Sequence, residues 1–77
     1  MLVDDHAIVR GGVRRLLEPL GVGWTIVEAT SAFQALECLR RQAFSLAVVD
    51  LSMPGMSGLE LIRRIKTEYP AVAVLVL

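Results

Sequence analysis

Apolar residues in this chain form two patterns that alternate from one end to the other. Short continuous apolar runs are typical of strands in a parallel sheet that is covered on both faces. Apolar residues spaced three or four positions apart are typical of helices that bury one face. Four runs predict strands: Leu2-Val3, Thr25-Val27, Leu46-Val49 and Val72-Leu77. A helical stripe follows each of the first three runs, so we expect three helices between four strands.

The helical stripes predict which residues the helices bury. The first helix is expected to bury Val9, Val13, Leu16, Leu17 and Leu20, and to be ended by Pro19, Gly21 and Gly23. The second is expected to bury Ala32, Ala35, Leu36 and Leu39, and the third Leu59, Ile62 and Ile65. Strands that alternate with helices pair in parallel through right-handed crossovers, so the predicted fold class is α/β.

Two of the helix starts carry a capping box. Ser31 stands three residues before Gln34, and Ser57 stands three residues before Glu60. In this motif the hydroxyl accepts a hydrogen bond from the third helical amide, and the later side chain reaches back to the start of the helix. Pro70 is expected to end the third helix.

The composition fits one small domain whose apolar cover is incomplete. The chain has 77 residues, and 55% of them are hydrophobic. Ordinary soluble domains are about 45–50% apolar, so the excess is what a core with part of its cover missing would show. The last run, Val72-Leu77, is expected to form an edge strand that favours aggregation or dimerisation.

Charge and cysteine content exclude several classes of function. Eight basic and eight acidic residues give zero net charge, so no field of one sign attracts nucleic acid or an anionic membrane. The single Cys38 excludes an internal disulfide and fits a reducing compartment. The apolar run Ala71-Leu77 is far shorter than the roughly 20 residues that span a bilayer. Asp4 and Asp5 come too early for a signal peptide, and we expect a cytoplasmic location.

Three aspartates are expected to meet at one edge of the sheet. Asp50 follows the third apolar run directly, and Asp4-Asp5 follow the first. Open α/β proteins bind ligands at the carboxyl edge of the sheet. Carboxylates gathered there repel one another, and a hard cation such as Mg²⁺ relieves that repulsion. We predict a Mg²⁺ site in which Asp5 is a direct ligand, Asp4 acts through water and the Ser52 backbone carbonyl adds a neutral oxygen.

Asp50 is the best-placed nucleophile because it ends the central strand. Beside a bound cation, an aspartate can attack phosphorus and form an acyl phosphate. The alternative for an aspartate between strand and helix is an N-cap role, which remains open for Asp4 and Asp5. Ser57 already caps the helix after Asp50. His6 is interpreted as a surface residue, since Mg²⁺ prefers oxygen ligands.

These residues resemble the receiver domain of bacterial two-component response regulators. The matched signals are the acidic pair, the aspartate after the third strand and the loop Met53-Pro54-Gly55-Met56-Ser57-Gly58. The resemblance spans the whole chain but only the first four of the family's five βα units. It implies a flavodoxin-like (CheY-like), doubly wound parallel sheet of order 2-1-3-4. Asp50 matches the phosphoacceptor, Asp4-Asp5 match the magnesium-binding pair, and Ser52 matches the residue whose carbonyl faces the metal.

The opening Asp4-Asp5-His6-Ala7-Ile8-Val9-Arg10-Gly11-Gly12 most resembles the NarL/FixJ subfamily. That resemblance implies a sensor histidine kinase as partner and a helix-turn-helix DNA-binding output domain that regulates transcription. The family also uses a Ser/Thr after the fourth strand, and a Lys and an aromatic residue in a fifth strand. These positions lie beyond Leu77. Residues 1–77 are therefore expected to be an incomplete receiver domain, without the fifth βα unit and any output domain.

Two other functions compete with the receiver hypothesis. One is a phosphorylation-independent interaction module that uses the exposed fourth strand to form a homodimer. The other is a Mg²⁺-dependent hydrolase with an aspartyl nucleophile. Such phosphatases place a second aspartate two residues after the first, and here that position is Ser52. The hydrolase is therefore disfavoured, and we expect a regulatory protein rather than an enzyme.

Overall fold

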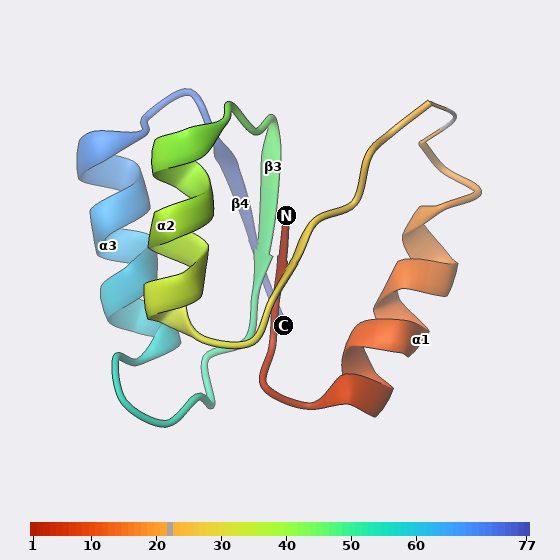
Figure 1. The fold of residues 1–77 in the computed structure, drawn as a ribbon, viewed down its shortest axis with the longest axis horizontal. Coiled ribbons are helices and arrows are strands. Elements are labelled where there is room, and N and C mark those ends of the chain that lie inside the picture. Colours follow the sequence, from red (N-terminus) through yellow and green to blue (C-terminus); the bar gives the residue numbers. More distant parts are fainter. Residues whose placement is uncertain (22) are drawn as a thin grey trace.

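The structure is a computed structural model that describes residues 1–21 and 23–77. Within these residues a single four-stranded parallel sheet has the order β2-β1-β3-β4, which confirms the predicted order (Figure 1). The strands are β1 (Leu2–Val3), β2 (Glu28–Ala29), β3 (Leu46–Val49) and β4 (Ala73–Val76). The helices are α1 (Ala7–Leu17), α2 (Ala32–Arg41) and α3 (Gly58–Glu68).

The register of the two central strands places their carboxyl ends side by side. Leu2 of β1 pairs with Val48 of β3, and Val3 pairs with Val49. The amide of Asp50 donates a hydrogen bond of 3.0 Å to the carbonyl of Val3. The residues that follow β1 and β3 therefore start from the same level of the sheet.

Helices α2 and α3 lie together on one side of the sheet (Figure 1) and form the core with it. The hydroxyl half of each capping box forms as predicted: the Gln34 amide donates to the Ser31 hydroxyl at 3.1 Å, and the Glu60 amide donates to the Ser57 hydroxyl at 3.2 Å. Gln34 also reaches back, although it accepts from Thr30 rather than from Ser31. The core of this side consists of Met1, Val3, Ala29, Ala32, Ala35, Leu39, Ala47, Val49, Met53, Leu61, Ile62 and Ile65.

The buried face of α3 differs from the prediction at one position. Leu59 was expected in the core, but 54% of its surface is exposed, whereas Leu61 is fully buried. Gly58, Leu61, Ile62 and Ile65 are the buried residues of α3, and they follow the i, i+3, i+4, i+7 spacing of one helix face. Leu59 is out of phase with that face.

The prediction that α1 buries an apolar stripe is wrong. No residue of α1 is buried: Val13 and Leu17 are half-buried, and Leu16 is 72% exposed. Val9 and Leu20 of the same stripe are also exposed. In Figure 1 α1 stands apart from the other two helices, on the far side of β1. The helix ends at Leu17, although Glu18 keeps helical dihedral angles and donates its N–H to the Arg14 carbonyl. Pro19 has no backbone N–H, so it cannot continue this series of hydrogen bonds.

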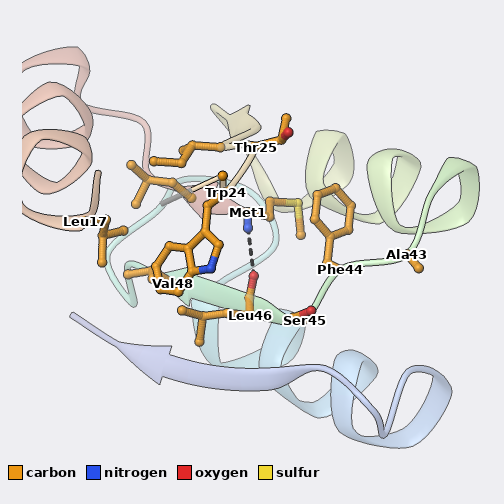
Figure 2. A pocket seen from close by; sticks show the side chains of 12 residues that line it. Met1, Leu17, Trp24, Thr25, Ala43, Phe44, Ser45, Leu46 and Val48 are labelled. Atoms are coloured by element: carbon orange, nitrogen blue, oxygen red, sulfur yellow. Dashed lines mark hydrogen bonds between the residues drawn. The ribbon is translucent and has the colours of Figure 1, made fainter. Parts of the chain in front are cut away.

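A cavity of about 340 Å³ lies on the α1 side of the sheet (Figure 2). Met1, Leu17, Trp24, Phe44 and Val48 are among the residues that line it. Trp24 lines the cavity although it is 55% exposed. None of the helices in the described part of the chain has the length and apolar composition that crossing a membrane requires.

The second strand lies later in the sequence than predicted. Thr25-Val27 was expected to form it, but the strand is Glu28–Ala29. A strand exists only where it has a partner, and β1 offers Leu2 and Val3, which pair with Glu28 and Ala29. The fourth strand is also shorter than predicted, at Ala73–Val76.

Candidate functional site

The predicted acidic residues meet at the carboxyl edge of the sheet. Asp4, Asp5, His6 and Asp50 each offer one ligand atom, and these four atoms lie within 4.8 Å of one another. Asp4 and Asp5 follow β1, and Asp50 follows β3. The parallel pairing of β1 with β3 is what brings these distant parts of the sequence together.

Asp4 is buried and makes hydrogen bonds within its own turn. Its side chain is 1% exposed. Oδ1 accepts hydrogen bonds from the His6 backbone N–H at 2.8 Å and from His6 Nδ1 at 3.0 Å. The Asp4 carbonyl accepts a hydrogen bond of 2.8 Å from the Arg10 guanidinium. These contacts fix the turn between β1 and α1.

Asp5 carries the unsatisfied oxygen of the site. Its Oδ1 is buried and has no hydrogen-bond partner in the described chain. His6 Nδ1 lies only 2.9 Å away, but that ring nitrogen makes its hydrogen bond with Asp4. A buried carboxylate oxygen without a partner is costly. A cation bound between the carboxylates would supply the missing interaction.

Asp50 is oriented by its own loop. Its side chain is 16% exposed, and its Oδ1 accepts a hydrogen bond of 3.0 Å from the Ser52 N–H. That bond closes an Asx turn, which holds the carboxylate at the end of β3. Ser52 thus lies next to Asp50, as predicted, although the contact seen here uses its N–H. The role of its carbonyl as a ligand stays a prediction.

Gly58 lets α3 start directly against Asp50. A Cβ at Gly58 would collide with the Asp50 carbonyl oxygen and come within 2.7 Å of the Leu51 Cα. Gly55, in the same loop, has a φ of +76°, which glycine adopts without strain. In the same loop, Met53 is buried and Met56 packs on the core. Both methionines therefore anchor the loop by packing.

His6 lies closer to the acidic residues than the sequence analysis predicted. Its side chain is 60% exposed, as expected of a surface residue, but Nδ1 faces three carboxylates. The distance to Asp50 Oδ2 is 3.9 Å. The hydrogen bond to Asp4, followed by the charge of Asp5, raises the pKa of the imidazole. The sequence feature that could have indicated this contact is the position of His6 directly after the acidic pair, where it becomes the N-cap residue of α1.

An ion-pair cluster beside the site was also missed. Arg10 Nε lies 3.0 Å from Glu28 Oε1, and Arg14 Nη1 lies 2.7 Å from Glu28 Oε2. The two arginines lower the pKa of Glu28. Because Arg10 also binds the Asp4 carbonyl, the cluster links α1, β2 and the acidic turn. Arginines spaced four apart gave no sign of a partner in β2, since that strand's register was not known.

Comparison with known proteins establishes the family. The response regulator receiver domain family matches residues 1–77, and the chain belongs to that family.

Two curated relatives illustrate the match. The response regulator UvrY of Escherichia coli is 38% identical over 77 residues, which cover 100% of this chain and 35% of UvrY. The nitrate/nitrite response regulator NarP of E. coli is 32% identical over 77 residues, which cover 100% of this chain and 36% of NarP. The chain thus spans about a third of the length of these relatives.

The fold is shared with solved receiver structures. The response regulator TrrA of Thermotoga maritima, solved in complex with Mg²⁺ and BeF, superposes with a TM-score of 0.86 at 27% identity. The match covers 95% of this chain and 62% of TrrA. The CheY-like fold predicted from the sequence is therefore confirmed, and residues 1–77 have the sequence and fold of a receiver domain, a regulatory module of two-component signalling.

The donor set fits Mg²⁺. Asp4, Asp5 and Asp50 supply carboxylate oxygens, which are the ligands that hard cations prefer. The orphaned Asp5 Oδ1 points to a missing positive partner. The side chain of His6 is exposed at the edge of the three carboxylates. An ion can therefore reach the carboxylates from solvent.

Proposed function

We propose that Asp50 accepts a phosphoryl group from a phosphohistidine of a sensor histidine kinase. In this proposal Mg²⁺ is held by Asp4, Asp5 and Asp50, and by the backbone carbonyl of Ser52. The observation that carries the proposal is the convergence of the three carboxylates at the ends of β1 and β3. The bound ion would neutralise charge on the phosphoryl oxygens.

The chain's own groups prepare the nucleophile. Ser52 holds Oδ1 of Asp50 through its N–H, which fixes the plane of the carboxylate. A carboxylate oxygen attacks phosphorus, and a new O–P bond forms as the P–N bond of the donor breaks. The electron pair stays on the departing imidazole nitrogen, which takes up a proton. The product is an acyl phosphate on Asp50.

The remaining parts of the proposal concern the whole protein. We infer that a Ser/Thr and a Lys in segments after Leu77 contact the phosphoryl oxygens, as the family pattern implies. The longer protein would carry a DNA-binding output domain and regulate transcription in the cytoplasm. The chain's similarity to UvrY and NarP, both named response regulators, supports the signalling part of this proposal.

Intact-mass spectrometry tests the phosphoacceptor directly. The full-length protein is incubated with a small acyl-phosphate donor, with and without Mg²⁺. We expect one added phosphoryl group that requires Mg²⁺ and is lost in Asp50→Asn. Glu60→Gln, which removes an exposed carboxylate on α3, is the matched control and should be phosphorylated normally. Addition that survives Asp50→Asn would refute the assignment.

A second candidate function has its own observation. Leu75 is 51% exposed, Val76 46% and Leu77 48%, which leaves an apolar edge along β4. Such an edge favours pairing with another copy of the chain. A phosphorylation-independent dimerisation module would give concentration-dependent dimers by sedimentation that neither Mg²⁺ nor phosphodonor changes. A monomer at all concentrations would exclude it.

A further inference from the structure

His6 is the nitrogen-bearing member of a cluster otherwise made of oxygen donors. Its Nδ1 lies 3.0 Å from Asp4 Oδ1 and 2.9 Å from Asp5 Oδ1. Adjacent ligands of an octahedral ion with bonds of roughly 2.1 Å lie about 3 Å apart. The 3.0 Å contact with Asp4 is a hydrogen bond in this structure, and the same spacing suits ligands that share one ion once Nδ1 carries no proton.

The backbone delivers the imidazole to this position. His6 is the N-cap residue of α1 with extended backbone, and its side chain makes no cap hydrogen bond. Its backbone N–H is held by Asp4 instead. The rest of the ring is exposed, so small rotations can move Nδ1 from its bond with Asp4 towards an ion without disturbing the core.

Carboxylate oxygen and imidazole nitrogen prefer different metal ions. Mg²⁺ prefers oxygen ligands and keeps several waters. Imidazole nitrogen is a better ligand for later first-row ions such as Ni²⁺, whose affinities for nitrogen-containing sites exceed those of Mn²⁺. A histidine at this site would therefore affect the binding of Ni²⁺ far more than that of Mg²⁺.

We propose that His6 Nδ1 is an additional ligand at this site, so that late first-row divalent ions are bound through nitrogen and oxygen whereas Mg²⁺ is bound through oxygen alone. The inference uses the same site as the proposed function. It assigns to His6 a role in cation selectivity and no role in phosphoryl transfer.

Calorimetric titration of the full-length protein with Ni²⁺ and with Mg²⁺ tests the proposal, in buffer alkaline enough to keep the imidazole neutral. In His6→Gln we expect the Kd for Ni²⁺ to rise by about tenfold or more. The Kd for Mg²⁺ should stay within about twofold, because its ligands are oxygens. Cys38→Ser, which removes the single thiol of this chain, is the control and should leave both constants unchanged.

A spectroscopic measurement gives an independent readout. Cu²⁺, a late first-row ion that imidazole binds well, should show nitrogen-14 modulation in its electron spin echo when bound to the unmodified protein, and His6→Gln should abolish that modulation. Unchanged Ni²⁺ affinity in His6→Gln would overturn the proposal. So would a parallel gain in affinity for both ions, since His6 would then be an obstacle to the ion rather than a ligand.

The outcomes separate this inference from the proposed function. If the protein is phosphorylated on Asp50 with Mg²⁺ but His6→Gln leaves Ni²⁺ binding unchanged, only the role of His6 is refuted. If Ni²⁺ binding depends on His6 but no phosphoryl group is accepted, the phosphoacceptor assignment fails and the ligand assignment stands.

Discussion

The two sides of the sheet are held in different ways. On the side of α2 and α3, fully buried residues such as Leu61 and Ile65 join the helices to the strands. On the side of α1 no helical residue is buried, and the helix is joined to the sheet through Arg10, Arg14 and Glu28. Apolar packing thus fixes one side, and exposed charge pairs fix the other.

The acidic site contains residues that are held in each of these two ways. Asp50 follows a strand whose residues Val48 and Val49 are buried, and its loop is anchored by Met53. Asp5 and His6 lie in the turn before α1, which is fixed by polar contacts. We therefore expect the phosphoacceptor to sit on the rigid part of the molecule and its partners from the β1–α1 turn to be easier to displace.

The largest expected effect contrasts one leucine from each side. Leu61→Ala opens a cavity in the core and should lower the free energy of unfolding by about 2–5 kcal/mol, since Leu61 is fully buried. Leu16→Ala on α1, where the side chain is 72% exposed, should change it by less than about 0.5 kcal/mol. Urea unfolding followed by circular dichroism measures both.

The contrast between the two sides of the sheet would be refuted if Leu61→Ala and Leu16→Ala lowered the free energy of unfolding equally. A loss at Leu16 as large as that at Leu61 would mean that another segment or another copy of the chain covers α1. Sedimentation of Leu16→Ala at several concentrations would distinguish these two explanations.

Two glycines give the next contrast. Gly58→Ala places a methyl group against the Asp50 backbone, and overpacking of this kind costs about 1–3 kcal/mol. Gly12→Ala meets nothing within 4 Å and lies inside α1, where alanine is favoured over glycine by about 0.5–1 kcal/mol. Opposite signs are expected in thermal unfolding. A stable Gly58→Ala would show that α3 can move away from β3 without cost.

The sequence predicted the α2 and α3 side better than the α1 side. The caps at Ser31 and Ser57 and the run Leu46–Val49 appear as predicted because each depends on local hydrogen bonds or a continuous apolar pattern. The stripe on α1 has the same local signal as that on α2. Whether it is buried depends on what packs against it, which periodicity does not specify.

Within the candidate site, some placements could likewise be predicted from the sequence and others could not. Asp4, Asp5 and Asp50 could be placed together because parallel strands bring their carboxyl ends to one edge. The contact of His6 with them depends on its rotamer and on the path of the turn. The ion pairs of Glu28 depend on the register of β2. Such details follow from tertiary geometry and carry no sequence pattern.

A smaller effect is expected from the start of α3. Ser57→Ala removes the acceptor for the Glu60 amide and should cost about 1 kcal/mol. Ser57→Asp keeps an acceptor at the helix N-terminus and should restore most of that stability. The midpoint of urea unfolding reports both. An Ala variant as stable as the unmodified protein would show that water replaces the cap, which would weaken the contrast with α1, where His6 provides no side-chain cap.

The smallest effect concerns the charges that hold α1. The pKa of Glu28 is lowered from its ordinary value of 4.5 by its hydrogen bonds with Arg10 and Arg14. A carboxylate whose pKa is lower in the folded state stabilises that state above its unfolded pKa, and this contribution is lost as the pH falls through the folded pKa. The Tm of the unmodified protein should therefore exceed that of Glu28→Gln at neutral pH. The difference should begin to shrink as the pH falls to about 4.5 and should vanish only below the lowered pKa of Glu28 in the folded state. High salt should reduce the difference at neutral pH, because exposed ion pairs are screened. A difference that persists in acid and in salt would mean that Glu28 acts through packing, and that the α1 side is held by the same kind of contact as the α2 and α3 side.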